Sequence, residues 1–257
     1  MQTLNSAVMH SARLTPFLSL AGLLGMWVVA AMLTQDAQIL PTPWQLLPPL
    51  RQELASGELW THLSATIVRV IWAFALAMSL GTILGLIMGR SAAVNRWLDP
   101  WLVVFLNLPA LVLIVLCYLW IGLTEAAAIT AVTLNKVPNV AVVIREGARA
   151  LDPDLDALGK VYRMSWWTRM RHIVFPQLAP FVAAASRSGL AVIWKIVLVV
   201  EFLGRSSGIG FQIHLYFQLF DVAMVLVYAF SFITVMLLVE WIFLQPFERH
   251  VARWRSA

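Results

Sequence analysis

Six apolar runs, each long enough to cross a lipid bilayer as a helix, dominate the sequence. A hydrocarbon core of about 30 Å requires about 20 apolar residues in a helix. The runs lack the two-residue alternation and the turn spacing of a β-barrel, so we expect helices rather than strands. The predicted spans are residues 16–33, 67–89, 101–123, 126–144, 178–203 and 222–244. The sequence therefore predicts an all-α, polytopic transmembrane helical bundle of six spans, forming a single domain over residues 1–257.

The composition excludes most other classes of protein. Hydrophobic residues make up 61% and charged residues 12% of the chain, whereas soluble domains have about 45–50% and about 25%. So much apolar surface is incompatible with a soluble or disordered chain, and the single cysteine, Cys117, excludes a disulfide-stapled module. The basic residues form no stripe that would bind nucleic acid. The five histidines lie far apart, so no metal site is expected.

The basic residues predict the orientation of the chain in the membrane. Loops rich in lysine and arginine face the cytoplasm. The segments that would lie on the same side as the two termini carry twelve basic residues, and the opposite segments carry only Arg51 and Arg205. The twelve are Arg13, Arg90, Arg96, Arg145, Arg149, Lys160, Arg163, Arg169, Arg171, Arg249, Arg253 and Arg255. We therefore expect both termini in the cytoplasm.

The first apolar run has two interpretations. Its charged flank at Arg13 resembles the start of a signal peptide, but the run is long and residues 35–38 form a poor cleavage context. We expect a retained span. Cleavage would instead leave five spans and place the termini on opposite sides.

The polar insertion at residues 34–65 is rich in proline. Pro41, Pro43, Pro48 and Pro49 argue against a helix there and favour an extended path. From residue 54 to residue 68 the pattern becomes amphipathic, which predicts a short interfacial helix leading into the second span.

Three glycines in the second span predict close helix packing. Gly81, Gly85 and Gly89 are spaced four residues apart, which places them on one face of the helix. Another helix backbone can approach such a face closely.

The polar segment at about 145–175 is too long for a simple turn. Asp152 before Pro153 is a good N-cap, so a helix is predicted over residues 153–162. A second short helix is predicted over residues 166–174, with Ser165 as its N-cap and its end before Pro176. Such helices form either a docking surface or a lipid contact in which Trp166 and Trp167 anchor the interface.

This segment resembles the cytoplasmic loop motif of permease subunits in bacterial ABC importers. The usual motif is Glu-Ala-Ala, three residues, Gly, about nine residues and then Ile-x-Leu-Pro. Here the end matches at Ile173 and Pro176, whereas Arg163 stands at the usual glycine position. Ala157, Leu158 and Gly159 occupy the Glu-Ala-Ala positions, with Asp156 beside them as a substitute for the glutamate.

The resemblance is closer to the nitrate/sulfonate/taurine branch and extends over most of the chain. It includes the proline motif at residues 39–43, the pattern from 98 to 125, and Glu201 followed by Gly208 and Gly210. The resemblance implies a type I importer permease in the bacterial inner membrane, paired with a second copy as a homodimer. It also implies a cytoplasmic ATPase dimer, a periplasmic or lipid-anchored solute-binding protein and surrounding membrane lipid.

The resemblance also implies which residues couple the permease to its ATPase. They are Asp156, Ala157, Leu158, Gly159, Arg163, Ser165, Trp166, Trp167, Ile173 and Pro176. The chain itself has no Walker A sequence, because Gly159 and Lys160 are followed by Val161. We therefore expect ATP and Mg²⁺ on the partner ATPase, no cofactor on this chain, and no enzymatic activity of its own.

Charged residues inside spans are costly and need a partner or a polar pathway. The candidates for a translocation path are Asn135, Lys136, Asn139, Trp194, Lys195 and Glu201. One interpretation is a path that attracts a small anion. The other is ion pairing within the bundle, for example of Lys136 or Lys195 with Glu201 or Glu240, and ion pairing is favoured for Arg187 and Glu240.

The predicted function is the permease subunit of an ATP-driven importer of a small anionic solute, such as nitrate, a sulfonate, taurine or an aromatic acid. A secondary transporter or a channel that uses the buried charges is the alternative. A membrane hydrolase is poorly supported, because no His or Asp lies near Ser186 and Ser188 in the sequence.

Overall fold

The computed structural model describes residues 2–244, and it describes side chains for residues 18–242. Within these residues the regular structure is helical, with no strand. The chain divides into two compact units. Unit 1 contains Met1–Leu59 and Ile213–Phe230, and unit 2 contains Trp60–Gln212 and Ser231–Ala257. Arg249, Arg253 and Arg255 lie outside the described residues.

Unit 1 contains the N-terminal helix and the proline-rich segment. Helix α1 (Gln2–Thr34) is followed by a 3-10 turn (Pro43–Leu46) and by α2 (Leu47–Ser56). The Trp27 indole N–H donates to the Pro41 carbonyl at 3.1 Å, and its ring stacks on Phe230 with centroids 5.3 Å apart. These contacts fasten the loop after α1 to Trp27, and Trp27 to the middle of α11 (Val222–Val239).

The expectation of an extended path through the prolines is wrong in part. Pro43 begins the 3-10 turn, and Pro48 and Pro49 lie in the first turn of α2. The first turn tolerates proline because its N–H groups have no helical acceptor. The predicted helix at 54–68 is also divided, because α2 ends at Gly57, whose φ of +85° is left-handed.

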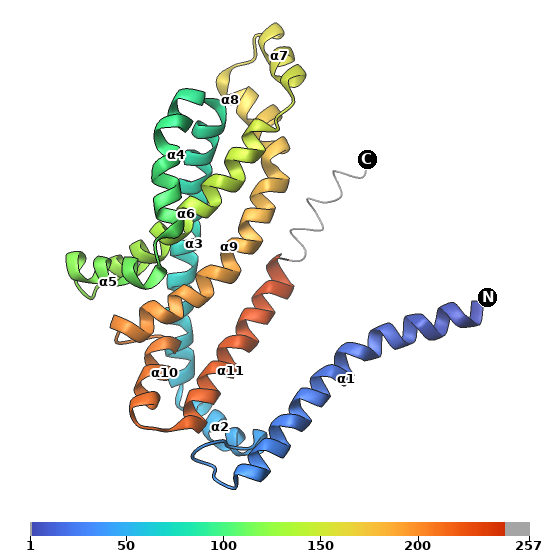
Figure 1. Ribbon diagram of the computed structural model, residues 1–257, viewed down its shortest axis with the longest axis vertical. Coiled ribbons are helices and arrows are strands. Elements are labelled where there is room, and N and C mark those ends of the chain that lie inside the picture. The colour runs from blue at the N-terminus through green and yellow to red at the C-terminus, as the bar shows by residue number, and fades with distance from the viewer. Residues whose placement is uncertain (1, 245–257) are drawn as a thin grey trace. The chain divides into compact units, whose positions relative to one another are not determined.

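Unit 2 is built around three long helices, α3, α6 and α9. Its elements are α3 (Glu58–Arg90), α4 (Ala92–Asn107), α5 (Ala110–Ile121), α6 (Glu125–Arg149), α7 (Pro153–Val161), α8 (Trp166–Arg169), a π turn (Met170–Val174) and α9 (Phe175–Gly204), with the start of α10 (Ile209–Gln218) and the second half of α11. Helix α6 is central, because it packs against α4, α5 and α9 (Figure 1).

Small side chains permit this close packing around α6. Ala127, Ala131 and Ala141 are almost completely buried. From α3, the three predicted glycines lie against α6. A Cβ at Gly85 would lie 2.4 Å from the Ala141 carbonyl oxygen, and a Cβ at Gly89 would lie 2.8 Å from the Arg145 carbonyl oxygen. The corresponding neighbour of Gly81 is Val140, at 2.5 Å.

The predicted span at 101–123 is wrong as a single helix. It is divided into α4 and α5, which meet at an angle of 98° (Figure 1). Leu108 adopts an extended conformation, with φ −70° and ψ 125°, directly before Pro109. Proline disfavours the helical conformation in the residue before it, so an apolar run that looks continuous bends at this point.

The described residues contain four helices that are long and apolar enough to cross a membrane, or five if α4 and α5 form one bent span. These helices are Glu58–Arg90, Glu125–Arg149, Trp166–Gly204 and Val222–Ile242. The apolar stretch Leu18–Thr34 at the end of α1 is shorter. Exposed apolar side chains such as Trp72, Ile83 and Leu237 cover the outer surfaces of these helices, as expected for lipid contact.

Candidate translocation path and coupling surface

A cluster of charges, in which Arg69 and Glu201 are buried and Glu125 is half exposed, joins three helices (α3, α6 and α9) and the loop before α10 at one end of unit 2. We call it the Arg69 cluster, and it consists of Thr66, Arg69, Glu125, Glu201, Arg205 and Ser207. Arg69, on α3, is only 4% exposed, and all five of its N–H groups donate. Two bonds of 2.7 Å reach the Glu125 carboxylate, one of 2.6 Å reaches Glu201, and two reach Ser207. A completely satisfied guanidinium is the condition under which a buried charge is tolerated.

Glu201 fixes the start of α10 against α3. Its carboxylate is fully buried and accepts hydrogen bonds from Arg69, from the Thr66 hydroxyl at 3.0 Å and from the Gly210 N–H at 2.9 Å. The N–H of Ile209, the residue before Gly210, donates to the Thr66 hydroxyl oxygen. Side chains from α3 and α9 thus satisfy the N–H groups that a helix leaves unpaired at its N-terminus.

His62 completes this anchor with a defined ring tautomer. The Gly208 N–H donates to His62 Nδ1 at 3.1 Å, which requires a lone pair on that nitrogen. The proton of the neutral ring is therefore on Nε2, which lies 2.6 Å from the Gln212 side-chain amide. The amide must present its oxygen to this N–H.

The cluster is balanced in charge. Arg205 donates to Glu125 at 2.5 Å and to the Leu123 carbonyl, so two arginines face two glutamates. The sequence prediction placed Glu201 on a translocation path or opposite a lysine, whereas the structure places it in this buried cluster. Sequence reasoning missed Arg69 as its partner, because the two residues are separated by 132 positions. The only signal was an arginine within an apolar run.

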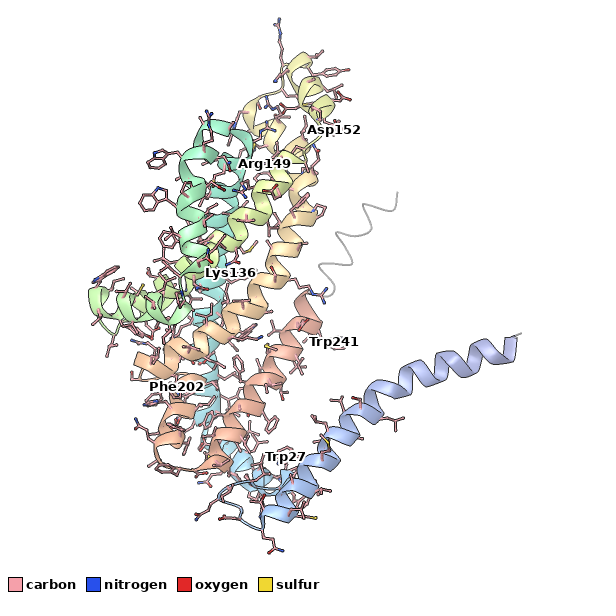
Figure 2. All side chains as sticks on the ribbon, viewed as in Figure 1. Trp27, Lys136, Arg149, Asp152, Phe202 and Trp241 are labelled. Carbon is pink, nitrogen blue, oxygen red and sulfur yellow. The ribbon has the colours of Figure 1, made fainter. Side chains whose placement is uncertain are left out.

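Lys136 is buried at the centre of unit 2, where α6 lies against α3 and α9. Its side chain is 4% exposed, and Figure 2 shows it between the α7 end, marked by Asp152, and the far end of α9, marked by Phe202. Its Cε lies 3.4 Å from the position of a Cβ at Gly189, and Phe74 and Met78 are close to the same point. Among the described residues Lys136 makes no ion pair, and the hydroxyl of Thr133, one turn earlier, has no hydrogen-bond partner.

The other predicted path residues have different environments. Lys195 is exposed in the middle of α9, and within the described part of the chain it has no ion-pair partner. Asn139 is exposed on α6 and donates to the Asn135 carbonyl at 3.3 Å. Trp194 is buried and packs edge-on against Phe232 of α11, with centroids 5.5 Å apart. Lys195 and the two asparagines are therefore the predicted path residues with exposed or partly exposed polar groups.

A hollow of about 510 Å³ lies between α9 and α11. Its polar lining residues are Arg187, Ser188 and Glu240, and its apolar walls include Leu190, Trp194 and Met236. We call it the α9–α11 hollow. Ser188, which lines it, is on the same face of α9 as Lys195, because the two residues are seven positions apart.

The segment between α6 and α9 lies at one end of these two helices (Figure 1), whereas Glu125 and Glu201 lie near their other ends, at the start of α6 and the end of α9. Asp152 caps α7 by accepting from the Asp154 N–H at 2.8 Å, which confirms the predicted helix start. Ser165 caps α8 in the same way, through the Thr168 N–H. The predicted end before Pro176 is wrong, because α8, the π turn and α9 continue as one helical stretch, Trp166–Gly204.

Asp156 holds this segment to α3. Its carboxylate accepts from Arg90 at 3.1 Å and lies 3.1 Å from Arg169 and 3.8 Å from Lys160. The hydrogen bond from Arg90 and the positive charges of Arg90, Arg169 and Lys160 lower the pKa of Asp156 below its ordinary value. The carboxylate is therefore ionised at neutral pH and joins α3, α7 and α8.

The remaining predicted coupling residues divide into buried and exposed groups. Gly159 and Ile173 are buried against each other, since a Cβ at Gly159 would lie 2.9 Å from Ile173 Cδ1. The exposed group presents an apolar and aromatic surface, in which Trp166 is 71% and Trp167 64% exposed. Its other members are Ala157, Leu158, Arg163 and Ser165, whereas Pro176 lies in the first turn of α9. Arg163 has a left-handed φ of +47°.

Comparison with known proteins places the chain in a family. Residues 79–245 match the family described as binding-protein-dependent transport system inner membrane component. The chain is 30% identical over 204 residues to the putative aliphatic sulfonates transport permease protein SsuC of Escherichia coli (strain K12), a match that covers 77% of this chain and 76% of that protein. It is 26% identical over 196 residues to the taurine transport system permease protein TauC of the same organism, covering 73% and 70%.

A solved structure shows the same fold. The crystal structure of an amino acid ABC transporter with histidines superposes with a TM-score of 0.63 at 19% identity, covering 78% of this chain and 97% of that chain. The family match, the sequence relatives and the fold agree. The chain therefore belongs to the family of inner membrane components of binding-protein-dependent transport systems.

Proposed function

We propose that the chain is the permease subunit of an ATP-driven importer for a small anionic solute. The observation that carries this proposal is Lys195, an exposed cation in the middle of a membrane-spanning helix with no ion-pair partner among the described residues. Because an ammonium group facing hydrocarbon is costly, this face of α9 borders a polar space. The partly exposed Asn135 and the exposed Asn139 supply further polar groups on α6.

Lys136 adds a second positive charge in the same bundle. A buried charge without a counter-charge is unfavourable, and a passing anion relieves that cost. The names of the sulfonate and taurine relatives support a solute that carries a sulfonate group. In this proposal Lys195 attracts the solute, and Lys136 contributes to the positive potential inside the bundle.

ATP hydrolysis is assigned to a separate chain. The exposed surface formed by Leu158, Trp166 and Trp167 is suited to dock a cytoplasmic ATPase dimer, which carries ATP and Mg²⁺. With α7 and α8 in the cytoplasm, the Arg69 cluster faces the opposite side, where a solute-binding protein delivers the solute. Two copies of the permease form the complete path, with both termini in the cytoplasm of a bacterium.

The test is uptake into proteoliposomes that contain the permease, its ATPase and its binding protein. Lys195→Ala should abolish ATP-dependent uptake, whereas Lys195→Arg, which keeps the charge, should retain a substantial part of it. ATPase activity measured without solute should be unchanged in both variants, which shows that the complex is assembled. Full uptake by Lys195→Ala would contradict the anion path, and uptake abolished by a proton uncoupler at constant ATP would favour a secondary transporter.

A further inference from the structure

A hollow of about 250 Å³ lies between the end of α3 and the helical segment that precedes α9. We call it the α3–α8 hollow, and its lining residues all belong to unit 2. They come from the last two turns of α3 and from the start of the continuous stretch Trp166–Gly204. Both helices are long and apolar enough to cross a membrane. The hollow therefore lies where two membrane helices reach the polar edge of the bilayer.

Two arginines that line this hollow are held by one carboxylate. The Nη2 atoms of Arg90 and Arg169 each lie 3.1 Å from the same oxygen of Asp156. The Lys160 ammonium lies 3.8 Å from the other oxygen. In the part of the chain that the structure describes, no other carboxylate is within ion-pair distance of these three cations. Three positive charges thus share one negative charge, which leaves the site with an excess of positive charge.

Most of the donors on the two guanidinium groups remain available. Over residues 18–242, the Arg90 side chain donates through Nη2 alone, and Arg169 contacts only the Asp156 carboxylate. The two side chains are 33% and 29% exposed, so they are fixed by Asp156 and are still accessible. The planar donor sets of two adjacent arginines match an anion with several oxygens, such as a phosphate.

The remaining walls of the hollow are apolar. Leu86 and Ile87 contribute from α3, and Met170 and Val174 contribute from the π turn. Ile87 is 48% exposed on a membrane-spanning helix, so it faces hydrocarbon. Trp166, at the rim, is of the residue type that is enriched at the headgroup level of a membrane. A ligand with a phosphate at one end and a hydrocarbon chain at the other would use both kinds of surface.

The charges of the hollow distinguish between classes of phospholipid. A zwitterionic headgroup carries an ammonium group beside its phosphate, and the excess positive charge of the hollow would repel that ammonium. Asp156 cannot compensate, because three cations already share it. An anionic headgroup without an ammonium avoids this repulsion. The volume of about 250 Å³ is below the range of about 300–1,000 Å³ of pockets that enclose a whole ligand, which suits a headgroup whose chains stay in the bilayer.

We propose that the α3–α8 hollow binds the headgroup of an anionic phospholipid, with the phosphate oxygens on Arg90 and Arg169 and the acyl chains along Ile87. Basic pockets between membrane helices on the cytoplasmic side are typical sites for acidic lipid headgroups. The proposed orientation, with α7 and α8 in the cytoplasm, places the site in the inner leaflet. The binding itself does not depend on which solute the permease transports.

The experiment titrates lipid onto the purified permease–ATPase complex in mild detergent and counts bound lipids by native mass spectrometry. The probes are palmitoyl-oleoyl phosphatidylglycerol and palmitoyl-oleoyl phosphatidylcholine, which share their acyl chains and differ in headgroup charge. We expect one phosphatidylglycerol per permease chain to bind more tightly than phosphatidylcholine. Arg169→Gln should weaken phosphatidylglycerol binding about fivefold, the factor that corresponds to one basic residue near an anionic lipid. Arg169→Lys, which keeps the charge, should retain most of the affinity.

The matched control is Arg171→Gln. Arg171 is an exposed arginine two positions from Arg169, and it does not line the hollow. Its replacement removes the same charge from the same segment and should leave the dissociation constant unchanged. Equal weakening by Arg169→Gln and Arg171→Gln would show diffuse attraction of lipid to a basic surface and would overturn the site.

Competition separates a lipid from a soluble phosphate. Glycerol 1-phosphate carries the phosphate without the acyl chains, so it should displace phosphatidylglycerol only at a far higher concentration. Ile87→Ala should weaken phosphatidylglycerol binding and leave glycerol 1-phosphate unaffected. Ile87→Ala removes no ion pair, so it provides the test if Arg169→Gln does not yield a monodisperse complex. Equal competition by the soluble phosphate would show that the apolar wall contributes nothing and would refute a lipid ligand.

The ATPase provides the last arm of the experiment, because Trp166 borders the hollow and also belongs to the surface proposed to dock the ATPase. The titration is repeated on the permease without its ATPase. Binding of phosphatidylglycerol in both samples supports a lipid site. Binding that is lost when the ATPase is present would show that an acidic group of the ATPase occupies the hollow, and equal affinity for the two lipids would also refute the proposal.

Discussion

Arg69 illustrates how one side chain determines the architecture at one end of unit 2. Its five donors join α3 to the start of α6, to the end of α9 and to the loop before α10. The four charges of the cluster cancel, and mutual bonding offsets the cost of burying Arg69 and Glu201. The fully bonded and buried pair of Arg69 and Glu201 at the centre of the cluster is suited to holding helices in place, not to conducting a solute.

Removing the arginine should therefore destabilise the protein strongly. Arg69→Gln leaves Glu201 buried without its counter-charge, and we expect a loss of about 3–5 kcal/mol in the free energy of unfolding. Thermal denaturation of the purified protein, monitored as the loss of monodisperse protein, measures the effect. The double variant Arg69→Gln/Glu201→Gln should recover part of the loss, and no recovery would show that charge burial is not the cause.

Arg163 carries a backbone conformation that does not suit its side chain. Its φ of +47° is left-handed, and it stands where the importer loop motif usually has glycine. Glycine adopts this conformation without steric cost, so Arg163→Gly should stabilise the folded protein by about 1 kcal/mol. The melting temperature of the purified complex is the measurement. Tyr162→Gly is the matched control. Because Tyr162 has an ordinary φ of −77°, glycine at this position should destabilise the folded protein.

At the scale of elements, the contact between α3 and α6 depends on the absence of side chains. A Cβ at Gly85 would lie 2.4 Å from a backbone oxygen of α6. Because this oxygen belongs to the backbone, no side-chain rotation can relieve the overlap. Gly85→Ala should therefore force the two helices apart and cost about 1–3 kcal/mol. Chemical denaturation in mild detergent measures the loss. Gly25→Ala on α1 has no atom within 4 Å of the new Cβ and should be neutral, and equal effects at the two sites would contradict the packing explanation.

The attachment of α7 and α8 to α3 depends on the charge of Asp156. Because the folded-state pKa of Asp156 is lowered, its contribution to stability is present above the pKa of an unfolded aspartate, about 3.9. The contribution is lost as the pH falls through the lower pKa of the folded state. Asp156→Asn should reproduce the protonated form at neutral pH and accelerate amide hydrogen exchange in α7.

A neighbouring aspartate provides the control for this prediction. Asp154 lies in the first turn of the same helix and, within the described residues, makes no ion pair. Asp154→Asn should leave hydrogen exchange in α7 nearly unchanged. Equal acceleration in both variants would show that the helix responds to net charge rather than to the contacts of Asp156.

At the scale of the whole molecule, the sequence predicted what depends on local pattern. The long apolar helices α3, α6, α9 and α11 and the caps at Asp152 and Ser165 follow from hydropathy and from the chemistry of neighbouring residues. The family resemblance, based on a short ordered series of motifs, was confirmed by the match over residues 79–245. The membrane helices and their family could therefore be predicted from the sequence.

What the sequence could not predict depends on contacts between distant residues or on competing local effects. The ion pairs of Arg69 connect residues 56 and 132 positions apart, and no periodicity reports such pairs. The bend between α4 and α5 was missed because hydropathy alone joined two helices across Pro109. Of the candidate path, Lys136 and Glu201 are buried while Lys195 is exposed, a difference that only three-dimensional packing decides.

The continuous helical stretch from Trp166 to Gly204 has a mechanical consequence. Its 39 residues correspond to a rod of about 58 Å at 1.5 Å per residue. Trp166 is at one end of the rod, and Glu201 of the Arg69 cluster is one turn from the other. A helix resists stretching, so a displacement that passes the π turn at Met170–Val174 is carried along α9 to Glu201 and the loop that it holds. A displacement at one end of this helical stretch would thus reach the other end through the helix itself and not through the loops.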